Sequence, residues 1–524
     1  MSDTSKYKVT ERNGIGRLIF TGLVFIGEIA FVIWGFQSLN SYAGWIDAMT
    51  RILAVALVLA IYSMNKTSSL KTPWIILMLA SPILGVGLYL IVGLNVPTIR
   101  MRRRYERIDA ALLPKLTEGK YGEQAKKNIE ALRMTDPHLA NIADYLTRKS
   151  GYPPYRNTDV VYYKDASEGI EAQKEEMRKA KSFIFLEYHA IEAGESWYEL
   201  EEILKEKVRQ GVEVRVFYDD AGSIGFVNMD FAKRLRASGI RCRVFNPFMP
   251  GLNMFLNNRD HRKITVIDGV VGFTGGYNLA DEYFNVKSPY GLWKDTGIKI
   301  TGEAVRNLTV AFLENWNAVK SGDEDDMNVE KYLPETEYSA GENGIVQPYA
   351  DTPLDKEQVG EETYISMINA ATEYCYFVTP YLILTDEMIH AIGLAAKRGV
   401  DVRIITPGIP DKRVVYSLTR SYYRSLVRNG VRIYEWSPGF CHCKMCIIDD
   451  KAAICGTINL DYRSLYHHFE NSCLYVGCKA VADTKRDFET MFEQSTEVTE
   501  KYTSGRYSFL RLGHLILRLF APLL

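Results

Sequence analysis

The sequence predicts an α/β protein built from two pseudo-symmetric units behind an N-terminal helical transmembrane region. Three features favour this class: apolar runs near the N-terminus, alternating β-rich and helical stretches beyond about residue 150, and one motif that occurs in both halves. A chain of 524 residues is long enough for roughly three domains. With 47% hydrophobic and 24% charged residues, it is neither a disordered chain nor a disulfide scaffold.

Apolar runs at residues 18–36, 48–64 and 74–94 predict that residues 1–98 anchor the chain in a membrane. A bilayer core needs about 20 apolar helical residues, so the first and third runs are long enough and the second is marginal. Buried core helices are the alternative. Residues 99–154 are predicted to form a basic juxtamembrane helical connector. Basic clusters flank the runs on both sides, which leaves the number of crossings open.

The body of the chain is predicted to contain unit 1 at 155–320, an acidic linker at 321–345 and unit 2 at 346–500, followed by an amphipathic tail at 501–524. Unit 1 reads as a strand at 182–188, a helix at 197–210, Gly211 and a strand at 212–218. Unit 2 reads as a strand at 374–379, a helix at 386–398, Gly399 and a strand at 400–406. Helices that end at Gly and lead directly into Val-rich strands indicate parallel pairing.

A motif with identical internal spacing follows in each unit. Its members are His261, Lys263, Asp268 and Asn278 in unit 1, and His442, Lys444, Asp449 and Asn459 in unit 2. Residues two apart on a strand share a face, so each His and Lys are expected to point the same way. A neutral imidazole can attack phosphorus or move a proton near pH 7, and an ammonium group can neutralise phosphate oxygens. The aspartates could anchor the site, and the asparagines could donate hydrogen bonds to phosphate.

The paired motif resembles that of the phospholipase D superfamily, and within it the bacterial cardiolipin synthases. Residues 257–269 resemble the first family motif, and residues 456–466 with Glu470 resemble the second. This resemblance implies two phospholipase D-like α-β-α sandwich units with His261, Lys263, Asp268, His442, Lys444 and Asp449 in catalysis. It also implies substrate binding by Asn278, Asn459 and Glu470, and the last of these is a candidate for orienting an imidazole.

The resemblance further implies a reaction that uses neither a metal nor another cofactor. One imidazole, taken here as His261, attacks the phosphorus of phosphatidylglycerol, and His442 protonates the departing glycerol. A second phosphatidylglycerol then attacks the phosphohistidine and gives cardiolipin. The duplication itself favours neither histidine as nucleophile. The implied partners are phosphatidylglycerol and an anionic phospholipid membrane. The implied location is the bacterial cell membrane, as a multi-pass protein with its catalytic part facing the cytoplasm.

Several alternatives remain open at the level of the sequence. A membrane-bound phospholipase D-type phosphodiesterase would hydrolyse phospholipids, and a scaffold would bind lipid without turnover. A nuclease is disfavoured because 63 basic against 64 acidic residues leave a net charge of -1, so no nucleic-acid partner is expected. The segment 441–446 contains three Cys and one His, which could bind zinc, although strand alternation turns His442 away from Cys441 and Cys443. The oligomeric state is not predicted.

Overall fold

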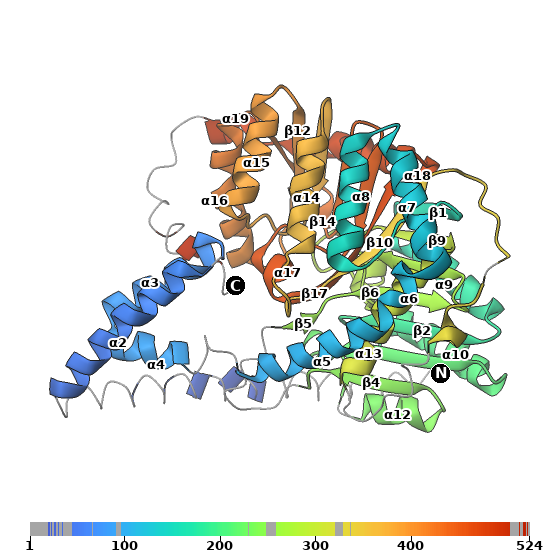
Figure 1. Cartoon of the computed structure of the whole chain (residues 1–524), viewed down its shortest axis with the longest axis horizontal. Coiled ribbons are helices and arrows are strands. Elements are labelled where there is room, and N and C mark those ends of the chain that lie inside the picture. Colours follow the sequence, from blue (N-terminus) through green and yellow to red (C-terminus); the bar gives the residue numbers. More distant parts are fainter. Residues whose placement is uncertain are drawn as a thin grey trace.

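The computed structural model describes residues 44–64, 66–90, 96–228, 230–247, 258–319, 329–335 and 337–503, with isolated positions between 19 and 34 and between 513 and 521. In these ranges the chain forms a seven-stranded and a nine-stranded sheet, both covered by helices. Figure 1 shows the first unit in green at the lower right and the second in orange and red above it.

The two sheets repeat one strand order. The first runs β1-β9-β7-β6-β2-β3-β4, and the second runs β10-β17-β16-β15-β11-β12-β13 with β18 at its edge. The ninth strand of the second sheet is β5 (Arg259–Asp260), which pairs with β17 outside this order. The first contains β1 (Thr158–Tyr163), β2 (Phe183–Tyr188), β3 (Glu213–Asp219), β4 (Arg241–Phe245), β6 (Lys263–Ile267), β7 (Val271–Gly275) and β9 (Gly297–Gly302). The second contains β10 (Ile345–Asp351), β11 (Tyr374–Val378), β12 (Asp401–Pro407), β13 (Arg432–Trp436), β15 (Met445–Ile448), β16 (Ala452–Gly456), β17 (His468–Val476) and β18 (Ser495–Glu497). The sequence duplication is therefore a duplication of the fold.

The predicted strand-helix-strand units are confirmed in both halves. The predicted strands correspond to β2, β3, β11 and β12, and the predicted helices correspond to α10 (Glu195–Arg209) and α15 (Asp386–Lys397). Both strand pairs are parallel. Gly211 and Gly399 have φ angles of 87° and 95°, a left-handed conformation that glycine adopts without a steric penalty. This conformation lets each helix turn directly into the next strand.

Helices pack around the sheets and between the units. Those of unit 1 are α9 (Ala166–Lys179), α10, α11 (Asp220–Ser223), α12 (Phe231–Ala237), the 3₁₀ helix η3 (Asp281–Phe284) and α13 (Val305–Val319). The 3₁₀ helix η5 (Glu330–Tyr332) precedes unit 2, whose helices are α14 (Val359–Ala370), α15, α16 (Arg413–Val427), α17 (Tyr462–Tyr466), α18 (Lys479–Glu493) and α19 (Thr499–Thr503). Helix α13 is buried along almost its whole length and contacts both β6 and β10. Helix α18 makes the reciprocal contact with β1.

Two short strand pairs join the units at the start of each motif. Strand β5 (Arg259–Asp260) pairs in parallel with β17 of the other unit, and β14 (Gly439–Cys441) pairs in parallel with β8 (Leu292–Lys294). Each motif histidine directly follows one of these strands. The contact between the units therefore fixes the backbone from which each imidazole projects.

The N-terminal region is helical, but the predicted membrane crossings are not found. Its helices are α2 (Gly44–Ser63), α3 (Ser68–Ala80), α4 (Pro82–Leu88), α5 (Val96–Leu112), α6 (Pro114–Thr117), α7 (Gly119–Arg133) and α8 (Pro137–Ser150). In the part of the chain that the structure describes, none of the helices combines the length and the apolar character needed to cross a bilayer. The predicted location as a multi-pass membrane protein is therefore wrong, whereas the membrane-anchoring role of residues 1–98 stays a prediction.

The second and third apolar runs differ in local structure. The third run breaks at Ser81, ahead of Pro82, so it forms α3 and α4 instead of one long helix. The second run lies in α2, where Arg51 pairs with Asp47 at 2.8 Å. Most of the first run, 18–36, lies outside the described residues.

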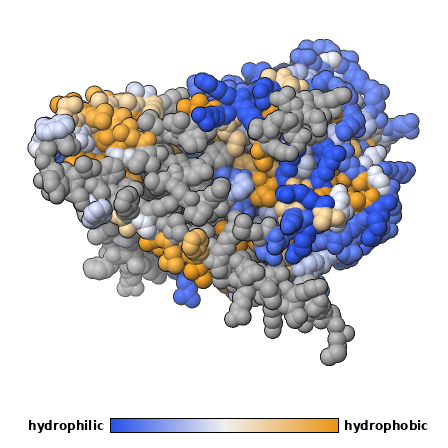
Figure 2. All heavy atoms as spheres, turned by 90° about the horizontal axis from the view of Figure 1, so that it is seen from below, coloured by the Kyte–Doolittle hydropathy of each residue, from blue (hydrophilic) through white to orange (hydrophobic). Residues whose placement is uncertain are grey.

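Helices α2, α3 and α4 form an arm beside the α/β body (Figure 1). Figure 2, which views the molecule from below, shows hydrophobic side chains gathered on this arm, whereas hydrophilic residues dominate the surface of the body. Trp45, Ile52, Leu59 and Leu79 are each more than 60% exposed there. The apolar runs of the sequence therefore place their side chains on the surface of the arm.

The remaining predicted segments are described only in part. The connector 99–154 is helical, and Arg104 on α5 donates to the carbonyl oxygen of Asn317 at 2.7 Å. The most acidic part of the linker, 320–328, lies outside the described residues, as does most of the tail. Arg518 in the tail donates to the carbonyl oxygen of Ser421 on α16 at 2.6 Å. This part of the tail packs against the body.

Candidate active site

The two motif histidines are attached to the opposite unit through their own backbones. The amide of His261 donates to the carbonyl oxygen of Phe469 at 2.8 Å, and the amide of His442 donates to that of Lys294 at 2.7 Å. These bonds continue the β5–β17 and β14–β8 pairings by one residue. Both histidines are buried, with 7% and 6% of their surface exposed. The two units thus present equivalent imidazoles from equivalent positions.

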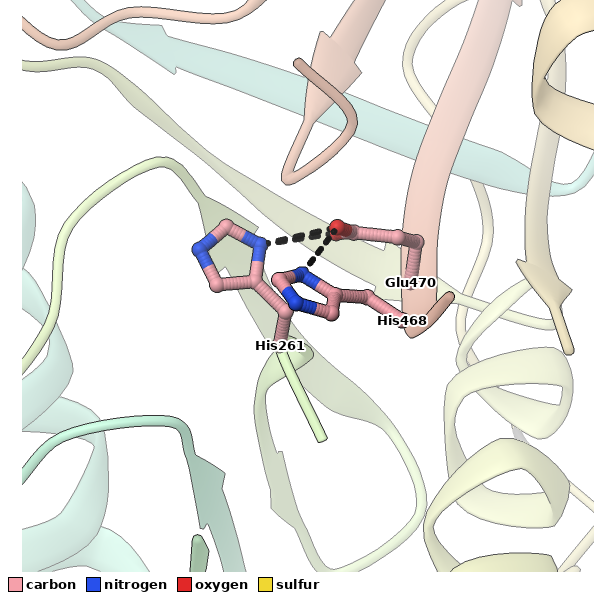
Figure 3. A group of neighbouring side chains, drawn as sticks. All are labelled: His261, His468 and Glu470. Atoms are coloured by element: carbon pink, nitrogen blue, oxygen red, sulfur yellow. Dashed lines mark hydrogen bonds and ion pairs between the residues drawn. The ribbon is translucent and has the colours of Figure 1, made fainter. Parts of the chain in front are cut away.

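A buried carboxylate of the opposite unit holds each imidazole. Nδ1 of His261 lies 2.9 Å from Oε2 of Glu470 on β17, and Nδ1 of His442 lies 2.7 Å from Oδ2 of Asp295, which directly follows β8. Figure 3 shows the Glu470 carboxylate turned toward the His261 ring. Because the Glu470 carboxylate accepts a hydrogen bond from Nδ1–H of His261, the lone pair of that ring is left on Nε2.

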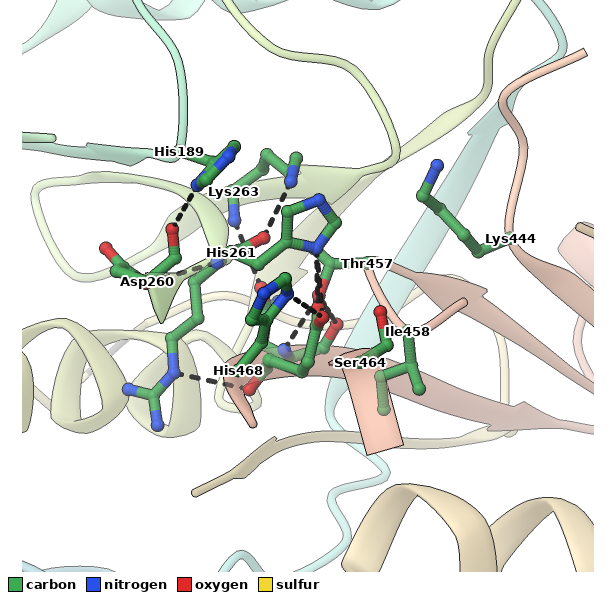
Figure 4. A network of polar contacts seen from close by, with 12 residues as sticks. His189, Asp260, His261, Lys263, Lys444, Thr457, Ile458, Ser464 and His468 are labelled. Carbon is green, nitrogen blue, oxygen red and sulfur yellow. Dashed lines mark hydrogen bonds and ion pairs between the residues drawn. The ribbon is translucent and has the colours of Figure 1, made fainter. Parts of the chain in front are cut away.

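Each motif lysine is buried beside its histidine. Nζ of Lys263 donates to the carbonyl oxygen of His261 at 2.7 Å, and Nζ of Lys444 donates to that of His442. Figure 4 shows the His261 ring between Lys263 and Lys444, one from each unit. Burial lowers the pKa of Lys263 to about 7, although the charge of Glu470 opposes that change. The pKa of Lys444 is also lowered by burial.

Burial and positive charge keep both imidazoles neutral. The pKa of His261 lies well below its usual value because the ring is buried and because Lys263 and Lys444 repel a further positive charge. The pKa of His442 is lowered by burial and by the same two lysines. Burial raises the pKa of Asp295 to about 7, against the opposing charge of Lys444. The His442–Asp295 pair is thus suited to hold a proton that can move near neutral pH.

The surroundings of the two histidines differ. The aromatic rings of Tyr283 and Trp293 lie 5.3 Å from that of His442. Around His261 the neighbours are imidazoles instead: His189 at 5.0 Å and His468 at 5.4 Å between ring centroids. The backbones of the two units are therefore pseudo-symmetric, whereas the side chains around the two histidines are not.

The predicted asparagines lie near the motifs but make different contacts. Asn278 is fixed on both sides, since its Oδ1 accepts from the amide of Ala190 at 3.2 Å and its Nδ2 donates to the Tyr283 hydroxyl at 2.7 Å. Asn459 is buried, and its Oδ1 has no hydrogen-bond partner among the described residues. Of the two asparagines, Asn459 therefore has the side-chain oxygen that can accept a hydrogen bond from another donor.

The motif aspartates lie away from the imidazoles. Asp268 and Asp449 come directly after the last residues of β6 and β15. At about 3.3 Å per residue, β6 places Asp268 roughly 16 Å from Lys263, the first residue of the strand. Asp268 accepts from the amides of Lys181, Ser182 and Phe183 at 2.7–2.9 Å. The structure thus brings together the histidines, the lysines and Glu470, and it places the aspartates at the turns that precede β2 and β11.

Replacing Asp449 with alanine is expected to destabilise the second unit without removing a group that faces the imidazoles. Its carboxylate accepts from the amides of Thr372, Glu373 and Tyr374 and from the Thr372 hydroxyl, at 2.7–2.9 Å. The loss of these bonds should cost about 2–4 kcal/mol, and alanine at a φ of 50° adds strain. Thermal unfolding should show a lower melting temperature for Asp449→Ala and a smaller loss for Asp449→Asn. Equal stability of wild type and Asp449→Ala would contradict this role.

The spacing of residues in the sequence reveals neither Asp295 as the partner of His442 nor His189 and His468 as neighbours of His261. Asp295 lies outside both motifs, and the matching registers of β7 with β9 and of β16 with β17 show that it corresponds to Glu470. The Cys-rich segment does not gather metal ligands. Nδ1 of His442 is taken by Asp295, and among the described residues the ligand group with suitable spacing is His261, His468 and Glu470.

The chain is similar to several known proteins. The family model described as "Cardiolipin synthase, PLD-like domain" matches residues 174–316 and 364–492. The chain is 31% identical to a cardiolipin synthase of Halalkalibacterium halodurans over 488 residues, which cover 92% of this chain and 95% of that protein. It is 42% identical to an uncharacterized protein of Streptococcus mutans over 451 residues, covering 86% and 96%. The crystal structure of phosphatidylserine synthase from Haemophilus influenzae Rd KW20 shares the fold, with a TM-score of 0.54 and 15% identity over 70% of this chain and 93% of that one.

The duplicated phospholipase D-like fold and these relatives define an enzyme of the phosphatidyltransferase class. Within that class, the chain belongs to the cardiolipin synthase family with the phospholipase D-like domain.

Proposed function

We propose that this enzyme transfers a phosphatidyl group from one phosphatidylglycerol to another and releases cardiolipin and glycerol. One observation carries the proposal: two imidazoles from duplicated units are each held at Nδ1 by a carboxylate of the opposite unit, with both motif lysines beside them. Such an arrangement provides a nucleophile, a proton carrier and two cations for a single phosphodiester. Relatives that are named cardiolipin synthase support this choice of substrate.

In the first step, Nε2 of His261 attacks the phosphorus and the bond to the glycerol headgroup breaks. The His442–Asp295 pair enters this step with two protons, one on Nε2 of His442 and one between Nδ1 and Asp295, and Nε2 gives its proton to the departing glycerol oxygen. Glu470 stabilises the positive charge that develops on the His261 ring, because it already accepts from Nδ1 and from the Thr457 hydroxyl. The assignment of His261 as nucleophile rests on this contrast with His442, whose partner Asp295 is suited to proton transfer.

In the second step, His442 takes the proton from the terminal hydroxyl of a second phosphatidylglycerol. That oxygen attacks the phosphohistidine, the bond between phosphorus and Nε2 breaks, and cardiolipin leaves. Lys263 and Lys444 neutralise the non-bridging oxygens in both steps. One phosphodiester replaces another, so the reaction needs neither a nucleotide nor another source of energy.

The identity of the products tests this proposal. The purified full chain, incubated with phosphatidylglycerol in mixed micelles, should form cardiolipin and glycerol in equal amounts. Phosphatidic acid as the main product would instead indicate hydrolysis by water. The absence of any turnover of phosphatidylglycerol, with folding verified by circular dichroism, would contradict both. Thin-layer separation of radiolabelled lipid distinguishes these outcomes.

A further inference from the structure

A group of metal-type ligands coincides with the proposed nucleophile. His261, His468 and Glu470 each offer one ligand atom, and these atoms lie within 4.8 Å of one another. Both rings turn a nitrogen toward the carboxylate, with Oε2 at 2.9 Å from Nδ1 of His261 and Oε1 at 3.6 Å from Nδ1 of His468 (Figure 3). Glu470 is fully buried, and the His468 side chain is 10% exposed.

The backbone fixes this group in place. His468 and Glu470 are two apart on β17, so their side chains project from the same face of the strand. The parallel pairing of β5 with β17 places His468 opposite Arg259, and it brings the amide of His261 to the carbonyl oxygen of Phe469. All three side chains therefore come from one rigid junction between the units.

His468 lacks the hydrogen bonds that a buried imidazole normally makes. Its Nε2 has no partner among the described residues, and its Nδ1 is beyond hydrogen-bond distance from Glu470. An unsatisfied buried polar group carries a desolvation cost that a bound ligand can remove. The His468 ring faces the Glu470 carboxylate, which also contacts the His261 ring. Two imidazoles beside one carboxylate form an environment in which each side chain can bind a cation.

The chemistry of these donors selects the type of cation. Two imidazole nitrogens and one carboxylate oxygen form a set that binds Zn²⁺ in proteins, whereas Mg²⁺ and Ca²⁺ prefer oxygen ligands alone. Ligands about 2.0–2.2 Å from a tetrahedral Zn²⁺ lie roughly 3.3 Å from each other. The His261–Glu470 and His468–Glu470 separations of 2.9 and 3.6 Å bracket that value, and all three ligand atoms lie within 4.8 Å of one another, so side-chain rotations can complete the site.

We propose that His261, His468 and Glu470 form an inhibitory binding site for a divalent transition-metal ion of the zinc type. The metal would bind Nδ1 of His261 in place of the proton shared with Glu470. The single proton of the neutral ring then moves to Nε2, and its lone pair is no longer available to attack phosphorus. The inhibitory effect rests on the proposed role of His261, whereas metal binding itself does not.

The positive charges nearby oppose this binding. Lys263 on β6 and Lys444, which directly precedes β15, face His261, and the carboxylate of Glu470 offsets only one of them. The affinity therefore depends on direct ligation by all three side chains. Removing one ligand should weaken binding at least tenfold, the loss that disturbing the surroundings of a metal site commonly causes.

The variant His468→Asn separates metal binding from catalysis, since His468 takes no part in the proposed reaction. Its neighbour His467 lies outside the ligand group, so His467→Asn is the matched control. Each full-length protein is freed of metal with a chelator and titrated with Zn²⁺ in a calorimeter. In parallel, cardiolipin formation is measured at increasing Zn²⁺, with Mg²⁺ as the comparison ion.

Wild type and His467→Asn should bind Zn²⁺ at one common site and lose activity as that site fills. His468→Asn should keep the metal-free activity of the wild type, while its dissociation constant and its midpoint of inhibition both rise at least tenfold. Mg²⁺ should not inhibit at the same concentrations. Equal Zn²⁺ binding by wild type and His468→Asn would overturn the proposed site. A binding difference between them without any phosphatidyl transfer by the wild type would leave the site intact and refute the proposed function instead.

Discussion

Replacing either His261 or His442 with alanine is expected to lower the rate of phosphatidyl transfer by roughly 10⁴-fold or more. Without His261 no covalent intermediate can form, and without His442 neither the departing glycerol nor the incoming hydroxyl has a proton partner. If the two imidazoles act on the same phosphodiester, as proposed, the double variant should be no slower than the slower single variant. Initial rates of cardiolipin formation for the four proteins provide the measurement.

His390→Ala is a suitable control, because His390 lies on an exposed part of α15. Its rate should match that of the wild type, and all variants should show the same circular dichroism spectrum. Full activity in either single variant would contradict a shared site. Losses that multiply in the double variant would indicate that the two histidines act independently.

Replacing Lys263 with methionine is expected to lower transfer by roughly 10²–10³-fold, as the removal of a donor to a developing anion does, and to stabilise the fold. Burial of an ammonium group costs folding free energy, and the lowered pKa of Lys263 reports this cost. Lys263→Met should gain stability on the order of a few kcal/mol at pH 7, reduced by about 1 kcal/mol for the lost bond to the His261 carbonyl. Chemical denaturation and initial rates measure the two effects.

The sign of the pH dependence follows from the same pKa. Below about pH 7, Lys263 is charged in both states, so folding pays the whole cost of burial. Between about 7 and 10.5 the unfolded chain binds the extra proton, and the stability contribution of this group rises with pH. The stability advantage of Lys263→Met should therefore be largest at or below pH 7 and should disappear above about 10.5.

Catalysis should follow the opposite trend. The ratio kcat/KM reports the free enzyme, which loses the Lys263 charge as the pH rises above about 7. The wild type should therefore show a descending limb in kcat/KM above that pH. Lys299→Met, at a partly exposed lysine on β9, serves as the control and should change neither stability nor activity appreciably. A Lys263→Met protein that is less stable than the wild type at pH 6 would contradict this account.

Much of the fold was predictable from the sequence because local signals and the duplication agree. The transitions at Gly211 and Gly399 mark where each helix ends and the next strand begins, and the structure confirms both. The equal spacing of His261 with Lys263 and of His442 with Lys444 indicated side chains on one face of each motif strand. These features depend on neighbours in the chain, which a single sequence displays.

The rest of the site depends on contacts between distant residues. Asp295 holds His442 across the junction of the units, yet no motif surrounds it in the sequence. Conversely, Asp449 belongs to the motif by spacing, but it binds the turn before β11. The apolar composition of the third run predicted one long helix, but Ser81 and Pro82 divide the segment into α3 and α4. Spacing in the sequence identified the strands, and the pairing of the units decided which side chains meet.

The central claim is that His261 carries the phosphatidyl group between the two half-reactions, with His442 at the same phosphorus. Rapid quenching of the full-length enzyme during turnover of labelled phosphatidylglycerol, followed by peptide mass spectrometry, tests it most directly. The account predicts a phosphatidyl adduct on the peptide that contains His261, formed by the wild type and absent from His261→Ala. An adduct confined to the peptide that contains His442, or label transfer by His261→Ala at the wild-type rate, would contradict it.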